Sequence, residues 1–151
     1  MKQSENILLI DSTQSELFVA LAPACHCEVR SNPTVRTCNE LRAHDRNLNK
    51  LTADLIDKAD AFAVVVGPGS WTGSRVGVVA VKAYAIATGK PIIALQAAGA
   101  CHCEQSEAIP SQYREALIAA ACRKFAAKEF TAARELAPFY NAEFKATPKK
   151  P

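Results

Sequence analysis

The sequence lacks the features of a secreted or membrane-spanning protein. Its N-terminus has no basic region followed by a long apolar stretch, and no run of about 18 apolar residues occurs in its 151 residues. These absences predict a cytoplasmic protein with no membrane partner. The net charge is only +3, so direct binding to nucleic acid is not indicated. The lysines near the C-terminus would nevertheless suit a complex that contains RNA (Lys145, Lys149 and Lys150).

A glycine-rich loop, GPGSWTG, spans Gly67 to Gly73 but lacks the spacing of the known nucleotide motifs. The dinucleotide fingerprint GxGxxG needs a glycine where Thr72 stands, and a P-loop needs a lysine where Ser74 stands. What remains is a strand, a turn and a helix N-terminus. The free N–H groups of such an end can bind an anion, or a hydroxyl side chain can cap them (Ser70, Thr72 or Ser74).

Four of the six cysteines lie in two copies of the pentapeptide ACHCE (Cys25, Cys27, Cys101 and Cys103). Four thiols and two imidazoles could bind zinc, but structural zinc sites commonly use CxxC rather than CxC. The identical copies resemble a duplicated or inserted segment more than a metal site. A disulfide framework is not indicated, because nothing points to an oxidising compartment. We therefore expect no metal or cofactor, and a zinc-binding module remains an alternative.

Apolar periodicity predicts an alternation of strands and helices. Strands are expected at residues 6–10, 16–21, 61–66 and 92–95, and helices at 39–55, 74–88 and 111–128. Asn39 is a candidate N-cap and Gly89 a candidate C-cap. Residues 23–37 read as a loop or ragged edge strand, and the tail after residue 134 as a final strand or extended segment. The order hairpin, helix, strand, helix, strand predicts an α/β fold with a mixed sheet.

Between residues 76 and 87, the helix expected at residues 74–88 contains almost only small and apolar residues, and Lys82 is the one clearly polar side chain there. A surface helix normally has a polar face. We therefore expect one side of this helix to cover the sheet and the other to meet a second helix, from this chain, a second copy or a different protein. Trp71, between two glycines of the loop, is expected to pack across the turn unless a partner covers it.

The motif GPGSWTGSRVGV resembles the TsaB (YeaZ) family, whose members carry a loop of the form GPGSFTGLRIG between a buried strand and a helix. LIDST is similar to the family's LDTST, GKPIIAL follows the helix as it does there, and LAPFY is similar to the closing Pro and Tyr segment. His44 followed by Leu48 and Leu51 resembles the family's histidine motif. The resemblance covers residues 6–22 and 38–98, and more weakly 115–144.

This resemblance implies an actin-like, ribonuclease-H-like domain at residues 1–98. An inserted or variable linker at 99–110 and a truncated C-terminal helix and tail at 111–151 would follow. It implies a non-catalytic scaffold subunit of the machinery that makes threonylcarbamoyladenosine beside the tRNA anticodon. A TsaD-like catalytic subunit would be the partner, a TsaE-like ATPase would join them, and tRNA would be reached only through the complex. A homodimer can form through the same helices.

Two groups of residues match the family by position, and a third group forms the expected partner interface. Asp11 and Ser12 match a phosphate-turn remnant, although an Asp that closes a hairpin turn is more often an Asx-turn residue. The glycine loop comprises Gly67, Pro68, Gly69, Ser70, Thr72, Gly73 and Arg75, and the expected partner interface comprises Gly77, Ala80, Val81, Tyr84, Ala87, His44 and Leu48. The enzyme alternative is a small actin-like ATPase or sugar kinase that uses Asp11 and the loop.

Overall fold

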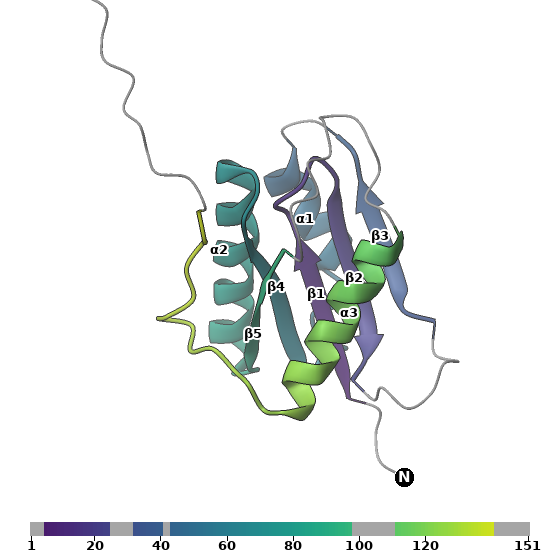
Figure 1. Ribbon diagram of the computed structural model, residues 1–151, viewed down its shortest axis with the longest axis vertical. Helices are drawn as coiled ribbons and strands as arrows, with labels where there is room; N and C mark the ends of the chain where they lie inside the picture. The colour runs from purple at the N-terminus through teal and green to yellow at the C-terminus, as the bar shows by residue number, and fades with distance from the viewer. Residues whose placement is uncertain (1–4, 25–31, 41–42, 98–110, 141–151) are drawn as a thin grey trace, which may run out of the picture.

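The computed structural model of the chain describes residues 5–24, 32–40, 43–97 and 111–140 (Figure 1). These ranges contain eight regular elements. They are β1 (Asn6–Asp11), β2 (Leu17–Pro23), β3 (Thr34–Cys38), α1 (His44–Thr52), β4 (Ala61–Gly67), α2 (Trp71–Thr88), β5 (Ile92–Gln96) and α3 (Ser111–Ala126).

The strands form one five-stranded sheet in the order β3-β2-β1-β4-β5. β1 and β2 make the predicted hairpin, and β3 continues the antiparallel half as the edge strand expected within residues 23–37. β4 runs parallel to both β1 and β5. The prediction of an α/β fold with a mixed sheet is therefore confirmed.

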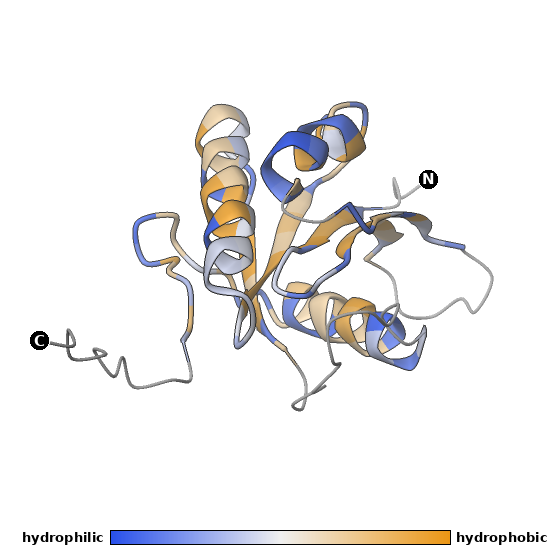
Figure 2. Cartoon of the chain, turned by 90° about the horizontal axis from the view of Figure 1, so that it is seen from above, coloured by the Kyte–Doolittle hydropathy of each residue, from blue (hydrophilic) through white to orange (hydrophobic). Residues whose placement is uncertain are grey.

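Helices cover both faces of the sheet: α1 and α2 lie on one side and α3 on the other (Figure 2). Alternation along β1 explains the two cores, since Leu8 and Ile10 pack toward α1 and α2 while Ile7 and Leu9 pack toward α3. β4 is buried at every position, as expected of a strand that is apolar throughout. α3 shares the second core, whereas the division of the chain at residues 98 and 111 stays a prediction.

The starts of α1 and α2 differ from the predictions, and α1 and α3 end earlier than expected, at Thr52 and Ala126. α1 begins at His44 and not at Asn39, because Cys38 still pairs with Leu17 in the sheet. α2 begins at Trp71, three residues early, because Ser70 caps it; it ends at Gly89 in the left-handed conformation, as predicted. Within the described ranges, none of the helices combines the length and the apolar character needed to cross a membrane.

The C-terminal segment, residues 129–140, returns along the sheet and α2 and is extended except for a turn at residues 133–135 (Figure 1). The Thr131 N–H donates to the Ile92 carbonyl at 2.8 Å, and the Phe139 N–H donates to the Val66 carbonyl at 2.7 Å. Between them Leu136 is 1% exposed and packs in the core beneath α2. The expected extended tail segment is present, and a single bridge pairs it with β5.

Truncating Leu117 tests whether α3 is part of the core. Leu117 is 1% exposed and packs against the sheet face opposite α2. We expect Leu117→Ala to lower the free energy of unfolding by about 2 to 5 kcal/mol, because it removes buried methyl groups and leaves a cavity. Urea denaturation measures this change. Glu115→Ala, at an exposed position of the same helix, is the control, and equal effects of the two variants would contradict the packing.

Candidate functional site

The turn after β1 and the loop after β4 meet at one edge of the sheet. β1 and β4 are parallel neighbours, with Ile10 paired to Val64, so their carboxyl ends lie together. The Ser70 N–H donates to the Thr13 carbonyl at 2.7 Å, and the Ser12 hydroxyl donates to the Gly73 carbonyl at 2.6 Å. We call residues 11–13 and 67–77 the loop junction. It joins the predicted phosphate-turn remnant to the predicted glycine loop.

The glycines allow the two halves of the loop junction to touch. A Cβ atom at Gly73 would overlap the carbonyl oxygen of Ser12, and one at Gly77 would overlap the Ser12 hydroxyl. A Cβ atom at Gly69 would similarly collide with Thr13. Because no side chain fits between these backbones, the loop needs glycine for close packing against its own chain.

Ser70 caps the start of α2. Its hydroxyl oxygen accepts a hydrogen bond from the Gly73 N–H at 3.2 Å, and its carbonyl oxygen accepts one from the Ser74 hydroxyl at 2.8 Å. Of the two uses that the sequence left open for this helix end, anion binding or capping, the structure displays capping. Thr72 is exposed on the first turn.

Asp11 is fully buried and both of its carboxylate oxygens have partners. Oδ1 accepts hydrogen bonds from the Thr13 N–H at 2.9 Å and the Thr13 hydroxyl at 2.7 Å, which is the expected Asx-turn. Oδ2 accepts one from the Tyr113 hydroxyl at 3.0 Å. Burial raises the pKa of Asp11, while the bonds from Thr13 and Tyr113 act in the opposite direction. Burial and the nearby carboxylate raise the pKa of Tyr113, so the phenol stays protonated and donates.

A second polar contact holds α3 near the same edge. Arg114 Nη2 lies 2.6 Å from Glu16 Oε2, and the Glu16 side chain is only 3% exposed. The Arg114 guanidinium also lies 5.4 Å from the centre of the Phe18 ring. Sequence reasoning missed both polar contacts of α3. Tyr113 lies four residues before Leu117 and so on the same side of the helix. A buried tyrosine hydroxyl needs a partner, but only the fold identifies that partner.

Three side chains form a stacked cluster at the start of α2, which we call the clasp. The rings of Trp71 and Tyr140 stack at 4.1 Å, and the Arg75 guanidinium lies 4.5 Å from the Trp71 ring. Arg75 Nε also donates to the Tyr140 hydroxyl at 3.2 Å. Trp71 therefore packs on the C-terminal segment and remains 52% exposed. Arg75, expected as part of the glycine loop, contributes to the clasp.

The residues expected at a partner interface divide into two groups. Gly77, Val81 and Leu48 are buried within this chain, so they are not available on its surface. The reason is that Gly77 lies against Ser12 while Val81 and Leu48 pack in the core, so this side of α2 faces the sheet. The remaining predicted residues keep some exposure (Ala80, Tyr84, Ala87 and His44).

Tyr84 and His44 also make contacts inside the chain. The Tyr84 ring lies 5.9 Å from the Phe62 ring, and its hydroxyl lies 3.0 Å from the Thr52 hydroxyl. His44 Nε2 donates to the Gln14 carbonyl at 3.0 Å and so ties α1 to the turn after β1. Both side chains are therefore already held by contacts within this chain.

Metal binding is not supported by the part of the chain that the structure describes. There, no three His, Cys, Asp or Glu side chains come together as a metal site. The proposed zinc ligands lie outside the described residues (Cys25, Cys27, Cys101 and Cys103). The zinc alternative therefore stays a hypothesis about those segments.

The contact between Gly77 and Ser12 can be tested by a double-mutant cycle. We expect Gly77→Ala to destabilise the fold by about 1 to 3 kcal/mol, although alanine favours helices, because the new methyl group overlaps the Ser12 hydroxyl. In the Ser12→Ala background the loss should shrink by about 1 kcal/mol or more. Urea denaturation of the four proteins gives the coupling. If the effects of the two substitutions on stability were additive, the overlap with the Ser12 hydroxyl would not be the cause of the loss.

The buried carboxylate predicts a pH-dependent effect of Asp11→Asn. Because the folded pKa of Asp11 lies above its ordinary value of 3.8, its contribution to stability is fully present below that value. It is lost as the pH rises through the folded pKa. Asparagine cannot ionise, so we expect the variant to gain stability relative to the parent chain as the pH rises above about 4. Denaturation across this range measures the trend. Asp45→Asn, exposed on α1, is the control. If the stabilities of Asp11→Asn and of the parent chain changed in parallel with pH, the prediction would be wrong.

Comparison with known proteins gives a family match and structural matches. The family model described as TsaD: tRNA N6-adenosine threonylcarbamoyltransferase matches residues 40–128, more than half of the chain. YeaZ from Pseudomonas aeruginosa is similar in fold, with a TM-score of 0.67 and 17% identity over 90% of this chain and 99% of that one. No curated protein matches the sequence.

A further crystal structure is described as an uncharacterized protein with similarity to peptidase YEAZ from Pseudomonas aeruginosa. It is 25% identical, with a TM-score of 0.51, over 61% of this chain and 43% of that one, so this chain spans less than half of its length. The fold match confirms the expected actin-like, ribonuclease-H-like class. The chain therefore belongs to the TsaD: tRNA N6-adenosine threonylcarbamoyltransferase family, and it is a TsaB-like (YeaZ-like) protein.

Proposed function

We propose that this chain is a non-catalytic scaffold subunit in the formation of threonylcarbamoyladenosine in tRNA. It pairs with a TsaD-like catalytic subunit through the outer face of α2. The family match and the YeaZ-like fold support the pathway. The exposure of one face of α2 supports the pairing.

The observation that carries this proposal is an apolar stripe on the outside of α2. Val79 is 64% exposed and Ile86 is 75% exposed, with Ala83 exposed between them and Val76 partly exposed before them. These four residues, the outer stripe, follow helical spacing, while Val78 and Val81 of the same helix fill the core. Contiguous exposed apolar surface marks sites of association. A partner helix that covers the outer stripe would remove this surface from water.

The loop junction argues against the alternative of an ATPase or sugar kinase. An actin-like enzyme would use Asp11 to position a metal and nucleotide, but both oxygens of this carboxylate accept hydrogen bonds from Thr13 and Tyr113. Ser70 and Ser12 are likewise engaged within the loop junction. These contacts favour an accessory role, in which the loop junction sets the position of α2.

The remaining parts of the proposal follow from the family resemblance. A TsaE-like ATPase joins the pair, and tRNA is bound only through the assembled complex in the cytoplasm. No cofactor is required by this chain. A homodimer through α2 is the competing arrangement of the same surface.

A charge on the outer stripe tests the pairing. We expect Val79→Arg to weaken association with the TsaD-like subunit of the source organism by about 2 kcal/mol or more, because it would bury an unpaired guanidinium. Size-exclusion chromatography of the mixture measures the association. Ala116→Arg, at an exposed position of α3 on the other face of the sheet, is the matched control. Ala80, which packs against the chain's own core, is a less selective position for this change.

The same variants test the function in cells. The parent chain and Ala116→Arg should restore threonylcarbamoyladenosine to the tRNA of cells that lack their TsaB subunit, and Val79→Arg should not. Mass spectrometry of tRNA nucleosides measures the modification. Failure of the parent chain to restore it, or full activity of Val79→Arg, would overturn the proposal.

A further inference from the structure

We infer that a cavity at the C-terminal end of α2 is an anchor pocket for one large apolar side chain of an acidic partner helix. This inference rests on the proposed function, because the partner that covers the outer stripe also fills the cavity. It names the chemistry of that partner and favours a different protein over a second copy of this chain.

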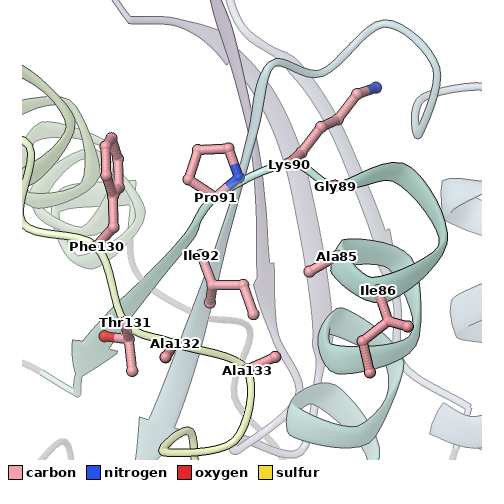
Figure 3. Close-up of a pocket in the computed structure, with 10 residues that line it drawn as sticks. All are labelled: Ala85, Ile86, Gly89, Lys90, Pro91, Ile92, Phe130, Thr131, Ala132 and Ala133. Carbon is pink, nitrogen blue, oxygen red and sulfur yellow. The ribbon is translucent and has the colours of Figure 1, made fainter.

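The cavity lies between α2, the start of β5 and the C-terminal segment (Figure 3). Its volume is about 290 Å³, and its walls are mainly apolar, with Ile86, Pro91, Ile92, Phe130, Ala132 and Ala133 among them. Phe130 is 43% exposed at the rim. This volume falls near the lower limit of about 300 Å³ for small-molecule sites, and it suits a protruding side chain.

Ile86 joins the cavity to the outer stripe. Its side chain is 75% exposed and lines the cavity from α2, opposite the segment that carries Phe130 and Ala132 (Figure 3). A partner helix that covers Val79 and Ala83 would therefore reach the rim of the cavity. The stripe and the cavity form one continuous apolar surface.

Of the residues that line the cavity, Lys90 and Thr131 are the two with polar side chains. Lys90 contributes to the wall, but its side chain points away from the cavity (Figure 3). Lys90 Nζ donates to the carbonyls of Ile56 at 2.9 Å and Asp57 at 3.4 Å. Small-molecule sites usually place several polar groups toward their ligand, whereas interface pockets take apolar anchors. The lining thus favours a protein side chain.

The charges beside the stripe select an acidic partner. Arg75 and Lys82 are seven residues apart, so they lie on the same side of α2, and none of its 18 residues is Asp or Glu. In the part of the chain that the structure describes, neither forms an ion pair. Two copies joined through α2 would bring these positive charges together, which disfavours that pairing. Glu or Asp residues beside the apolar stripe of a different protein would complement them.

Two variants test the cavity and the charge separately. Ala132→Trp fills the cavity, with Ala116→Trp on α3 as its control. Lys82→Glu reverses the charge, with Arg123→Glu on the exposed side of α3 as its control. We expect each test variant to weaken binding to the TsaD-like subunit at least about tenfold, and each control to stay within about twofold. Calorimetric titration measures the affinities. Added salt should weaken the parent complex more than the Lys82→Glu complex.

The outcomes separate this inference from the proposed function. If Val79→Arg abolishes binding while Ala132→Trp and Lys82→Glu leave it unchanged, the anchor pocket is wrong and the pairing through α2 stands. If the parent chain does not bind the TsaD-like subunit, both fail. A dimer of the parent chain that Ala132→Trp disrupts would make a second copy the occupant and overturn the acidic partner. Circular dichroism confirms folding, and if Ala132→Trp misfolds, Phe130→Ala, which truncates the exposed rim of the cavity, replaces it as the test of the cavity.

Discussion

The contact between the turn after β1 and the first turns of α2 determines where the rest of the structure can lie. The Ser12 hydroxyl donates to the Gly73 carbonyl, and the turn approaches α2 so closely that Gly69, Gly73 and Gly77 have no room for a Cβ atom. This contact fixes α2 against the end of β1 as well as against its neighbour β4. The direction of α2 in turn decides which of its apolar residues enter the core and which remain outside. A glycine loop that resembles a phosphate cradle thus serves here as a packing surface.

The regular elements were predictable because each leaves a local pattern. The buried strand Ala61–Gly67 reads as a continuous apolar run, and the end of α2 is marked by Gly89, whose φ of 71° suits glycine. The Asx-turn at Asp11 follows from an aspartate that closes a hairpin. The start of α1 was not predictable in the same way. Pairing of Cys38 with Leu17 keeps the chain in the sheet, and that pairing is not visible in the sequence around Asn39.

The candidate site was predictable in its membership but not in its contacts. The turn and the glycine loop were recognisable from LIDST and GPGSWTG, whereas the bond from Tyr113 to Asp11 joins residues 102 positions apart. The outer stripe was missed for a different reason. A helix with apolar residues on nearly every side has no polar face to show which side is exposed. Small residues such as Gly77 could therefore equally face a partner or the sheet. Only the close approach of Ser12 settles that orientation.

The clasp gives the chain an optical probe at one defined place. Trp71 is the only tryptophan of the sequence. It stacks on Tyr140 and belongs to neither of the two cores. Its emission therefore reports the contact between α2 and the C-terminal segment, whereas circular dichroism reports the helices as a whole. If the C-terminal segment detaches before the core melts, the two signals will have different midpoints. Such a difference would mark release of a single peripheral segment, with both faces of the sheet still covered.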